Sequence, residues 1–150
     1  MDLEQKLKIL VNKLSTGNFD EVIFEATYLN KKHPEQEIFY NLLSLGYQGK
    51  EEYEKSIDLL ENALKKSKNN INFLNNLGLS YYKKKDYNTA EKYFLKVLEI
   101  KPNYINTLNN LAALYEEINR VEKSEDLLKK SIKINSEVIE TNYNLASLLQ

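Results

Sequence analysis

The chain has 150 residues, of which 42% are hydrophobic, so it is long enough to bury a core as one domain or as a short array of repeats. Its 21 basic residues nearly balance its 22 acidic residues, which argues against a nucleic-acid or membrane partner held by net charge. The absence of cysteine excludes disulfides and thiolate metal sites and is typical of a reducing compartment.

The first predicted element is an amphipathic helix over "MDLEQKLKILVNKLS", which carries charges along its whole length. A signal peptide or a membrane-spanning helix needs an uninterrupted apolar run, and the longest apolar runs here are only a few residues. We therefore expect a cytoplasmic protein without membrane insertion.

From this helix onward, the sequence repeats every 34 residues without a gap. Aligned positions share their residue type, as in the apolar column Ile9, Leu43, Leu77, Leu111 and Leu145. The asparagine before the leucine also returns, as Asn76, Asn110 and Asn144. The period predicts one repeat domain over residues 1–150, with units at about residues 3–36, 37–70, 71–104 and 105–138 and a final helix over residues 139–150.

Each unit is expected to contain two helices. The spacing i, i+3, i+4, i+7 of an amphipathic helix is seen in the third unit at Leu74, Leu77, Gly78 and Tyr81. A short polar break follows at residues 83–86, and Pro34 and Pro102 end the second helix of the first and third units. Gly78 lacks bulk where the two helices of a hairpin must approach closely.

The fourth unit departs from this pattern, because Ser131 and Ser136 replace an apolar residue and the proline. The final predicted helix carries an apolar stripe that includes Leu145 and Leu149, and no second helix follows to cover it. We expect the natural chain to continue past Gln150. The alternatives are a monomer in which this helix is a cap, and a weak homodimer through the open C-terminal helix.

The third unit resembles the tetratricopeptide repeat signature, through Leu74, Leu77, Gly78, Tyr81, Ala90, Phe94 and Pro102. The resemblance covers essentially the whole chain. It implies an all-α fold, an α-solenoid in which antiparallel helix hairpins stack into a right-handed superhelix. It also implies that the first helix of each unit lines the concave surface, where partners bind.

A helical wheel of each first helix predicts which side chains face this concave surface. In the third unit, Asn76 points away from the packing stripe, while Asn75 lies on its flank. The same projection exposes Ile38, Leu42 and Leu45 in the second unit. The predicted partner-binding residues are Asn41, Leu45, Asn72, Asn75, Asn76, Leu79, Tyr82, Asn106, Asn109, Asn110, Ala113, Glu116, Tyr143 and Asn144.

These residues include many amides and little charge. Tetratricopeptide domains that hold acidic chaperone tails use lysines and arginines in a carboxylate clamp, so that function is not expected here. The row resembles instead the asparagine ladder of the glycosyltransferase that modifies nuclear and cytoplasmic proteins on serine and threonine. Because a carboxamide both donates and accepts, it can pair with the backbone of an extended peptide. The resemblance implies a protein-protein interaction scaffold for a protein or peptide.

Two alternatives stay open: a substrate-recruiting domain at the N-terminus of a longer glycosyl-, sulfo- or methyltransferase, and an oligomerisation module. An enzyme is not expected, because the only histidine, His33, directly precedes a proline and no nucleophile or phosphate-loop motif occurs. We expect no cofactor and no metal. Tyr47, Tyr81 and Tyr115 lie on the packing stripe rather than on a base-stacking surface, so we expect no nucleic acid partner.

Overall fold

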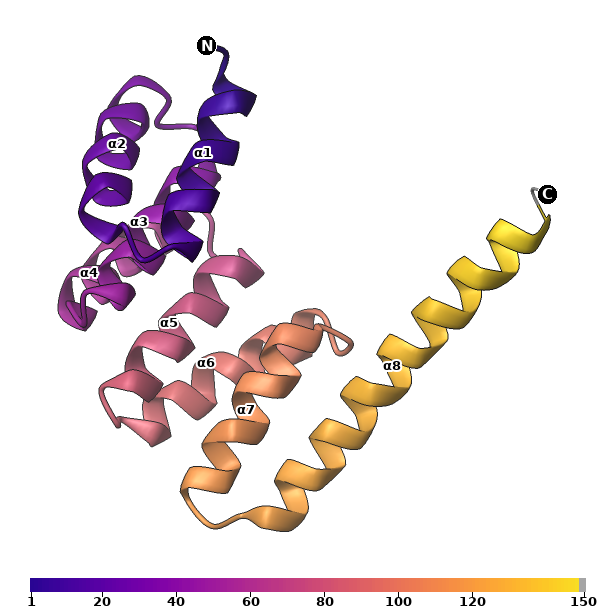
Figure 1. Cartoon of the computed structure of the whole chain (residues 1–150). Coiled ribbons are helices and arrows are strands. Elements are labelled where there is room, and N and C mark those ends of the chain that lie inside the picture. The colour runs from indigo at the N-terminus through magenta and orange to yellow at the C-terminus, as the bar shows by residue number, and fades with distance from the viewer. Residues whose placement is uncertain (149–150) are drawn as a thin grey trace.

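A computed structural model describes the backbone of residues 1–148 and the side chains of residues 1–137. The described residues form helices and no strand. In chain order the helices are α1 (Leu3–Ser15), α2 (Phe19–Lys32), α3 (Glu37–Gly49), α4 (Tyr53–Leu64), α5 (Ile71–Lys83), α6 (Tyr87–Ile100), α7 (Ile105–Glu117) and α8 (Val121–Leu148). Consecutive helices pack as antiparallel hairpins that stack into an α-solenoid (Figure 1), which confirms the predicted fold class.

The period of the sequence is also the period of the helices. The first helices of the four units begin at Leu3, Glu37, Ile71 and Ile105, each 34 residues after the one before. Each hairpin turn contains one residue with a positive φ, and these residues have the same spacing: Gly17 (80°), Glu51 (61°), Lys85 (67°) and Asn119 (60°). All four turns therefore contain one residue in the left-handed backbone conformation. Only the first turn places glycine there, the residue that adopts this conformation most easily.

The core consists of three hydrophobic clusters, each of which joins neighbouring units. The first cluster includes Leu10, Val22 and Leu43, the second is built around Leu60 and Leu77, and the third lies around Phe94 and Leu111. Because every unit shares its core with the next, no unit buries its apolar face alone, as expected for a solenoid.

Gly78 shows why the third unit needs a small residue at this position. A Cβ atom placed there would lie 2.5 Å from the ring of Phe94, which is fully buried. Because atoms in a packed core keep van der Waals distances, no larger side chain fits without displacing this ring. The expectation of a close approach between the helices of the third hairpin is confirmed.

The tyrosines of the packing stripe serve the core. Tyr47 and Tyr81 pack against hydrophobic clusters, and Tyr115 belongs to one. Tyr115 donates a hydrogen bond to Glu91 Oε1 at 2.7 Å, and burial together with this bond raises the pKa of Tyr115 to about 12. These rings are therefore partners of the core and of neighbouring carboxylates, and they do not form an open stacking surface.

The end of the chain differs from the prediction. The sequence predicts a break near residue 138 and a separate helix over residues 139–150, whereas α8 runs continuously from Val121 to Leu148. The proline that ends α6 at the equivalent point is replaced by Ser136, which keeps its backbone N–H and so permits the helix to continue. Figure 1 shows the far end of α8 extending away from the rest of the solenoid. No helix within the described residues is long and apolar enough to cross a membrane.

Candidate functional site

The first helices of the second, third and fourth units together form an open groove with a volume of about 540 Å³. Seven of the residues that line it are asparagines. The lining residues are Ile38, Asn41 and Leu45 from α3, Asn72, Asn75, Asn76 and Leu79 from α5, and Tyr104, Asn106, Asn109 and Asn110 at and after the start of α7. The structure thus brings together nine of the predicted partner-binding residues.

Two pairs of asparagines connect neighbouring units across this groove. Asn76 Nδ2 donates a hydrogen bond to Asn41 Oδ1 at 3.1 Å, and Asn110 Nδ2 donates one to Asn75 Oδ1 at 3.2 Å. Each pair joins residues 35 positions apart, so the same contact is made at two successive unit interfaces. The asparagine row is therefore a chain of interfacial contacts as well as a surface.

The side chain of Asn75 is shared between two donors from α7. Besides Asn110, the hydroxyl of Thr107 donates to Asn75 Oδ1 at 2.6 Å, and Thr107 is completely buried. One turn earlier along α5, Asn72 Oδ1 accepts a hydrogen bond from the hydroxyl of Tyr104 at 2.8 Å. These bonds fix the rotamers of the amides that line the groove.

Beneath Asn76 lies a buried polar cluster formed by Ser44, Ser56 and Ser80, all of which are fully buried. Their hydroxyls are linked at 2.9 Å between Ser44 and Ser56 and at 2.9 Å between Ser56 and Ser80. Gln48 extends the network, since its Nε2 donates to Ser80 Oγ at 2.8 Å and to the backbone oxygen of Asn76 at 3.0 Å. The groove floor on α5 is thus held to α3 by hydrogen bonds.

These contacts correct the predicted exposure of several groove residues. Asn76 is 9% exposed and Asn75 is 7% exposed, whereas the wheel placed Asn76 in the open. Leu42, which the wheel also exposed, is buried in the first hydrophobic cluster. A wheel describes one isolated helix, and stacking of the next unit covers this part of its surface.

Three other predicted residues lie outside the lining of the groove. Tyr82 packs against the third hydrophobic cluster, Ala113 is exposed on α7, and Glu116 accepts a hydrogen bond from Ser124 Oγ of α8 at 3.2 Å. Tyr143 and Asn144 lie outside the residues whose side chains are described. Tyr104 is a groove residue that the sequence reasoning did not select; its place directly before α7 is the signal that could have indicated it.

Several amide groups of the groove remain available to a ligand. Asn106 and Asn109 are exposed, and neither side chain forms a hydrogen bond with another described residue. Among the described residues, the only buried side-chain polar atom without a partner is Asn30 Oδ1, so the amide atoms left unpaired in the groove are open to solvent. The groove therefore offers both donors and acceptors, on amides held by hydrogen bonds between units and on the unbonded amides of Asn106 and Asn109.

The electrostatic character of the groove is neutral, since none of the described residues that line it is charged. Glu116 and Glu117 lie at the end of α7, beyond the residues that line the groove. There, burial together with the charges of Glu117 and Glu116 raises the pKa of Tyr82. A ligand in the groove would consequently contact neutral polar side chains rather than charged ones.

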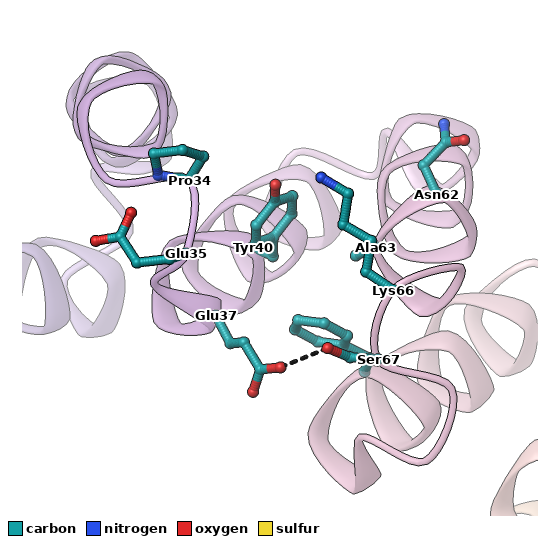
Figure 2. Close-up of a pocket in the computed structure, with 9 residues that line it drawn as sticks. Pro34, Glu35, Glu37, Tyr40, Asn62, Ala63, Lys66 and Ser67 are labelled. Atoms are coloured by element: carbon teal, nitrogen blue, oxygen red, sulfur yellow. Dashed lines mark hydrogen bonds between the residues drawn. The ribbon is translucent and has the colours of Figure 1, made fainter.

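A second hollow of about 400 Å³ lies between the start of α3 and the end of α4, and it was not predicted. Figure 2 shows it bordered by Tyr40, Ala63 and Lys66, with Glu37 accepting a hydrogen bond from Ser67 Oγ at 2.7 Å nearby. The signal in the sequence is the small Ala63, where the flanking units carry Leu29 and Val97. No group of three or more potential ligands for a metal ion is found among the described residues.

Comparison with known proteins agrees with this architecture. A family model described as tetratricopeptide repeat matches residues 69–137, and one described as TPR repeat matches residues 47–85. A search of curated protein sequences finds no match.

Solved structures share the fold over most of the chain. TTC0263, a thermophilic TPR protein of Thermus thermophilus, is 19% identical with a TM-score of 0.82, over 99% of this chain and 82% of that one. A crystal structure of MamA is 19% identical with a TM-score of 0.71, over 93% and 81%. MamA of Desulfovibrio magneticus RS-1 is 12% identical with a TM-score of 0.71, over 91% and 77%. On its helices, its 34-residue period and these matches, the chain belongs to the tetratricopeptide repeat family.

Proposed function

We propose that this chain is a protein-interaction scaffold that binds an extended peptide segment along the groove of α3, α5 and α7. The observation that carries the proposal is the concentration of seven asparagines in one uncharged groove. Peptide groups and carboxamides have the same donor and acceptor geometry, so a row of amides matches a polypeptide backbone better than it matches a phosphate or a carboxylate.

In this proposal the amides have two roles. Asn75 and Asn76 are nearly buried and hold the units together, and their remaining polar atoms form the floor of the groove. Asn106 and Asn109 project from α7 into solvent and are free to reorient toward a ligand. We therefore assign the principal peptide contacts to Asn106 and Asn109, with the floor amides as fixed secondary contacts.

The expected affinity is modest. A hydrogen bond to a neutral partner contributes about 0.5–1.5 kcal/mol net, because each group gives up water on binding. A few such bonds, together with apolar contacts to Leu45 and Leu79, correspond to a Kd on the order of micromolar. Contacts to the backbone discriminate little between side chains, so the groove should accept many sequences in an extended conformation.

The test begins with selection of binding peptides from a displayed random library. The selected peptide is then titrated against the protein by fluorescence anisotropy. The double variant N106A/N109A should weaken binding by about fivefold or more, because two backbone contacts are lost. The matched control is N135A, which removes an exposed asparagine from α8, and it should leave the affinity unchanged.

A second titration distinguishes backbone contacts from side-chain contacts. Methylation of the peptide's own backbone nitrogens removes donors without changing its side chains, and it should abolish binding. Equal affinity of the methylated peptide, or of the N106A/N109A variant, would contradict the proposal. Circular dichroism should show the same melting temperature for this variant and for the unmodified protein, since both side chains are exposed and unbonded.

A further inference from the structure

The outer face of α2 carries an aromatic pair that the core does not use. Phe24 is 78% exposed and Tyr28 is 52% exposed. The two residues are one turn apart, so their rings lie on the same face of the helix. An exposed apolar side chain by itself is ordinary, but two large rings side by side form an apolar patch on the surface.

The repeat supplies an internal comparison for this pair. The positions equivalent to Phe24 and Tyr28 in the other units are all exposed and all polar: Asp58 and Asn62, Lys92 and Lys96, and Asp126 and Lys130. Since three units fold with polar residues at these positions, the fold does not require aromatic side chains there. The pair in the first unit therefore calls for an explanation other than packing.

The aromatic pair adjoins a mainly apolar hollow of about 400 Å³ between α1 and α2. It is lined by Met1, Ile9, Tyr28 and Leu29, together with the charged residues Lys6, Lys13 and Glu25. Lys32 Nζ lies 4.5 Å from the centre of the Tyr28 ring. Hydrogen bonding to Lys32, together with the charges of Lys32 and Lys6, lowers the pKa of Tyr28. The ring is thus flanked by two ammonium groups.

The local charge balance around this patch is positive. The three acidic residues of α2 are all paired, since Glu21 and Glu25 contact Lys13 at 2.8 and 2.7 Å and Asp20 contacts Lys50. Within residues 1–137, no ion pair is formed by Lys6, Lys31 or Lys32. Lys31 follows Tyr28 by three residues and so lies on the same face. Three lysines without a carboxylate partner therefore lie on or beside the face of α2 that carries the aromatic pair.

From this arrangement we propose that the outer face of α2 is a docking surface for an anionic lipid bilayer. Phe24 and Tyr28 would enter the interfacial region, and Lys6, Lys31 and Lys32 would contact lipid phosphates. Aromatic side chains are favoured at this depth, and a lysine near an anionic membrane contributes about 1 kcal/mol. The surface is separate from the groove, with which it shares no residue.

Shape favours a bilayer over a protein partner. Phe24 protrudes from α2 at 78% exposure and does not line the hollow, and a fluid interface accepts a protruding side chain without a preformed pocket. A protein partner would need matching cavities for two rings and matching acids for three lysines. We therefore treat an acidic protein surface as the competing outcome of the experiment.

The experiment uses flotation with phosphatidylcholine vesicles that contain about one third phosphatidylglycerol, a composition that sets a strongly negative surface potential. The full chain should float with these vesicles and not with pure phosphatidylcholine, and about 0.5 M salt should release it, because screening removes the lysine contribution. The chain has no tryptophan, so F24W introduces a single reporter. Its emission should shift to the blue when anionic vesicles are added.

The decisive variant is F24D/Y28N, which installs the residues that the second unit carries at these positions. Its affinity for the vesicles should be lower by about tenfold or more, because the apolar contribution to binding is lost. I132N removes an exposed apolar side chain from α8 and should float as the unmodified chain does. Circular dichroism should report the same helicity for all three proteins.

Three results would overturn the proposal. The first is failure of the unmodified chain to float with anionic vesicles. The second is flotation of F24D/Y28N as strongly as that of the unmodified chain. The third is displacement of the chain from vesicles by a soluble polyglutamate peptide whose binding requires Phe24. That result would indicate that the patch binds an acidic protein.

Discussion

Three interfaces join the first helices of neighbouring units, and they place different residues at the same pair of positions. Between α1 and α3 the pair is Leu7 and Leu42, both packed in the first hydrophobic cluster. Between α3 and α5, and again between α5 and α7, the equivalent pair consists of two asparagines joined by a hydrogen bond. An apolar pair therefore satisfies the stacking geometry, and the asparagines are not required by the fold itself.

This difference coincides with the position of the groove. Asn41, Asn75, Asn76 and Asn110, the residues of the amide pairs, all line it, whereas the leucine pair lies outside its lining. Amides at these interfaces contribute to cohesion between units and also leave polar atoms facing outward. Leucines at the first interface contribute cohesion alone.

The largest expected effect comes from moving the amide pair to the first interface. The double variant L7N/L42N should lower the free energy of unfolding by about 3–4 kcal/mol, because two leucines leave the first hydrophobic cluster and one hydrogen bond replaces them. Urea denaturation followed by circular dichroism measures this loss. A loss below about 1 kcal/mol would show that the leucine and amide pairs are interchangeable, which would remove the contrast between the interfaces.

A smaller loss is expected from N75L at the third interface. Leucine cannot accept the hydrogen bond from Thr107, whose hydroxyl is fully buried, so we expect about 2 kcal/mol of destabilisation. The second substitution T107V removes that donor, and N75L/T107V should recover most of the stability. If the double variant is as unstable as N75L alone, the lost stability does not come from the unpaired hydroxyl.

The smallest change in stability is expected from N41L/N76L, which converts the second interface to the pair found at the first. The free energy of unfolding should change by less than about 1 kcal/mol, because both partners of the hydrogen bond are replaced together. The affinity for a groove-binding peptide should nevertheless fall, by less than is expected of N106A/N109A, since two secondary polar contacts of the groove floor are lost. Unchanged affinity in this variant would show that the amide pair does not contribute to peptide binding.

The helices and the groove could be read from the sequence because the repeat is regular. A gapless period of 34 residues sets where each hairpin begins, and the wheel of α5 placed Asn72, Asn76 and Leu79 on one surface, where the groove lies. Both inferences depend only on the spacing of residues within one helix or one unit, and this spacing can be counted along the sequence.

The contacts between units could not be read in the same way. The bond from Asn76 to Asn41 depends on the angle and offset at which two helices stack, and a wheel contains neither. The burial of Leu42 was missed for the same reason. The continuity of α8 past Ser136 was missed because the repeat was extrapolated across a position where its helix-ending proline is absent.

The two amide pairs also bear on the curvature of the solenoid. Each pair links adjacent first helices on the groove side, so bending the array open would lengthen both links, while tightening it would compress them. A hydrogen bond weakens steeply when it is stretched or misaligned, so the pairs resist such bending within a narrow range. A peptide that competes for these amides would loosen those links, and the radius of the superhelix would then report whether the groove is occupied.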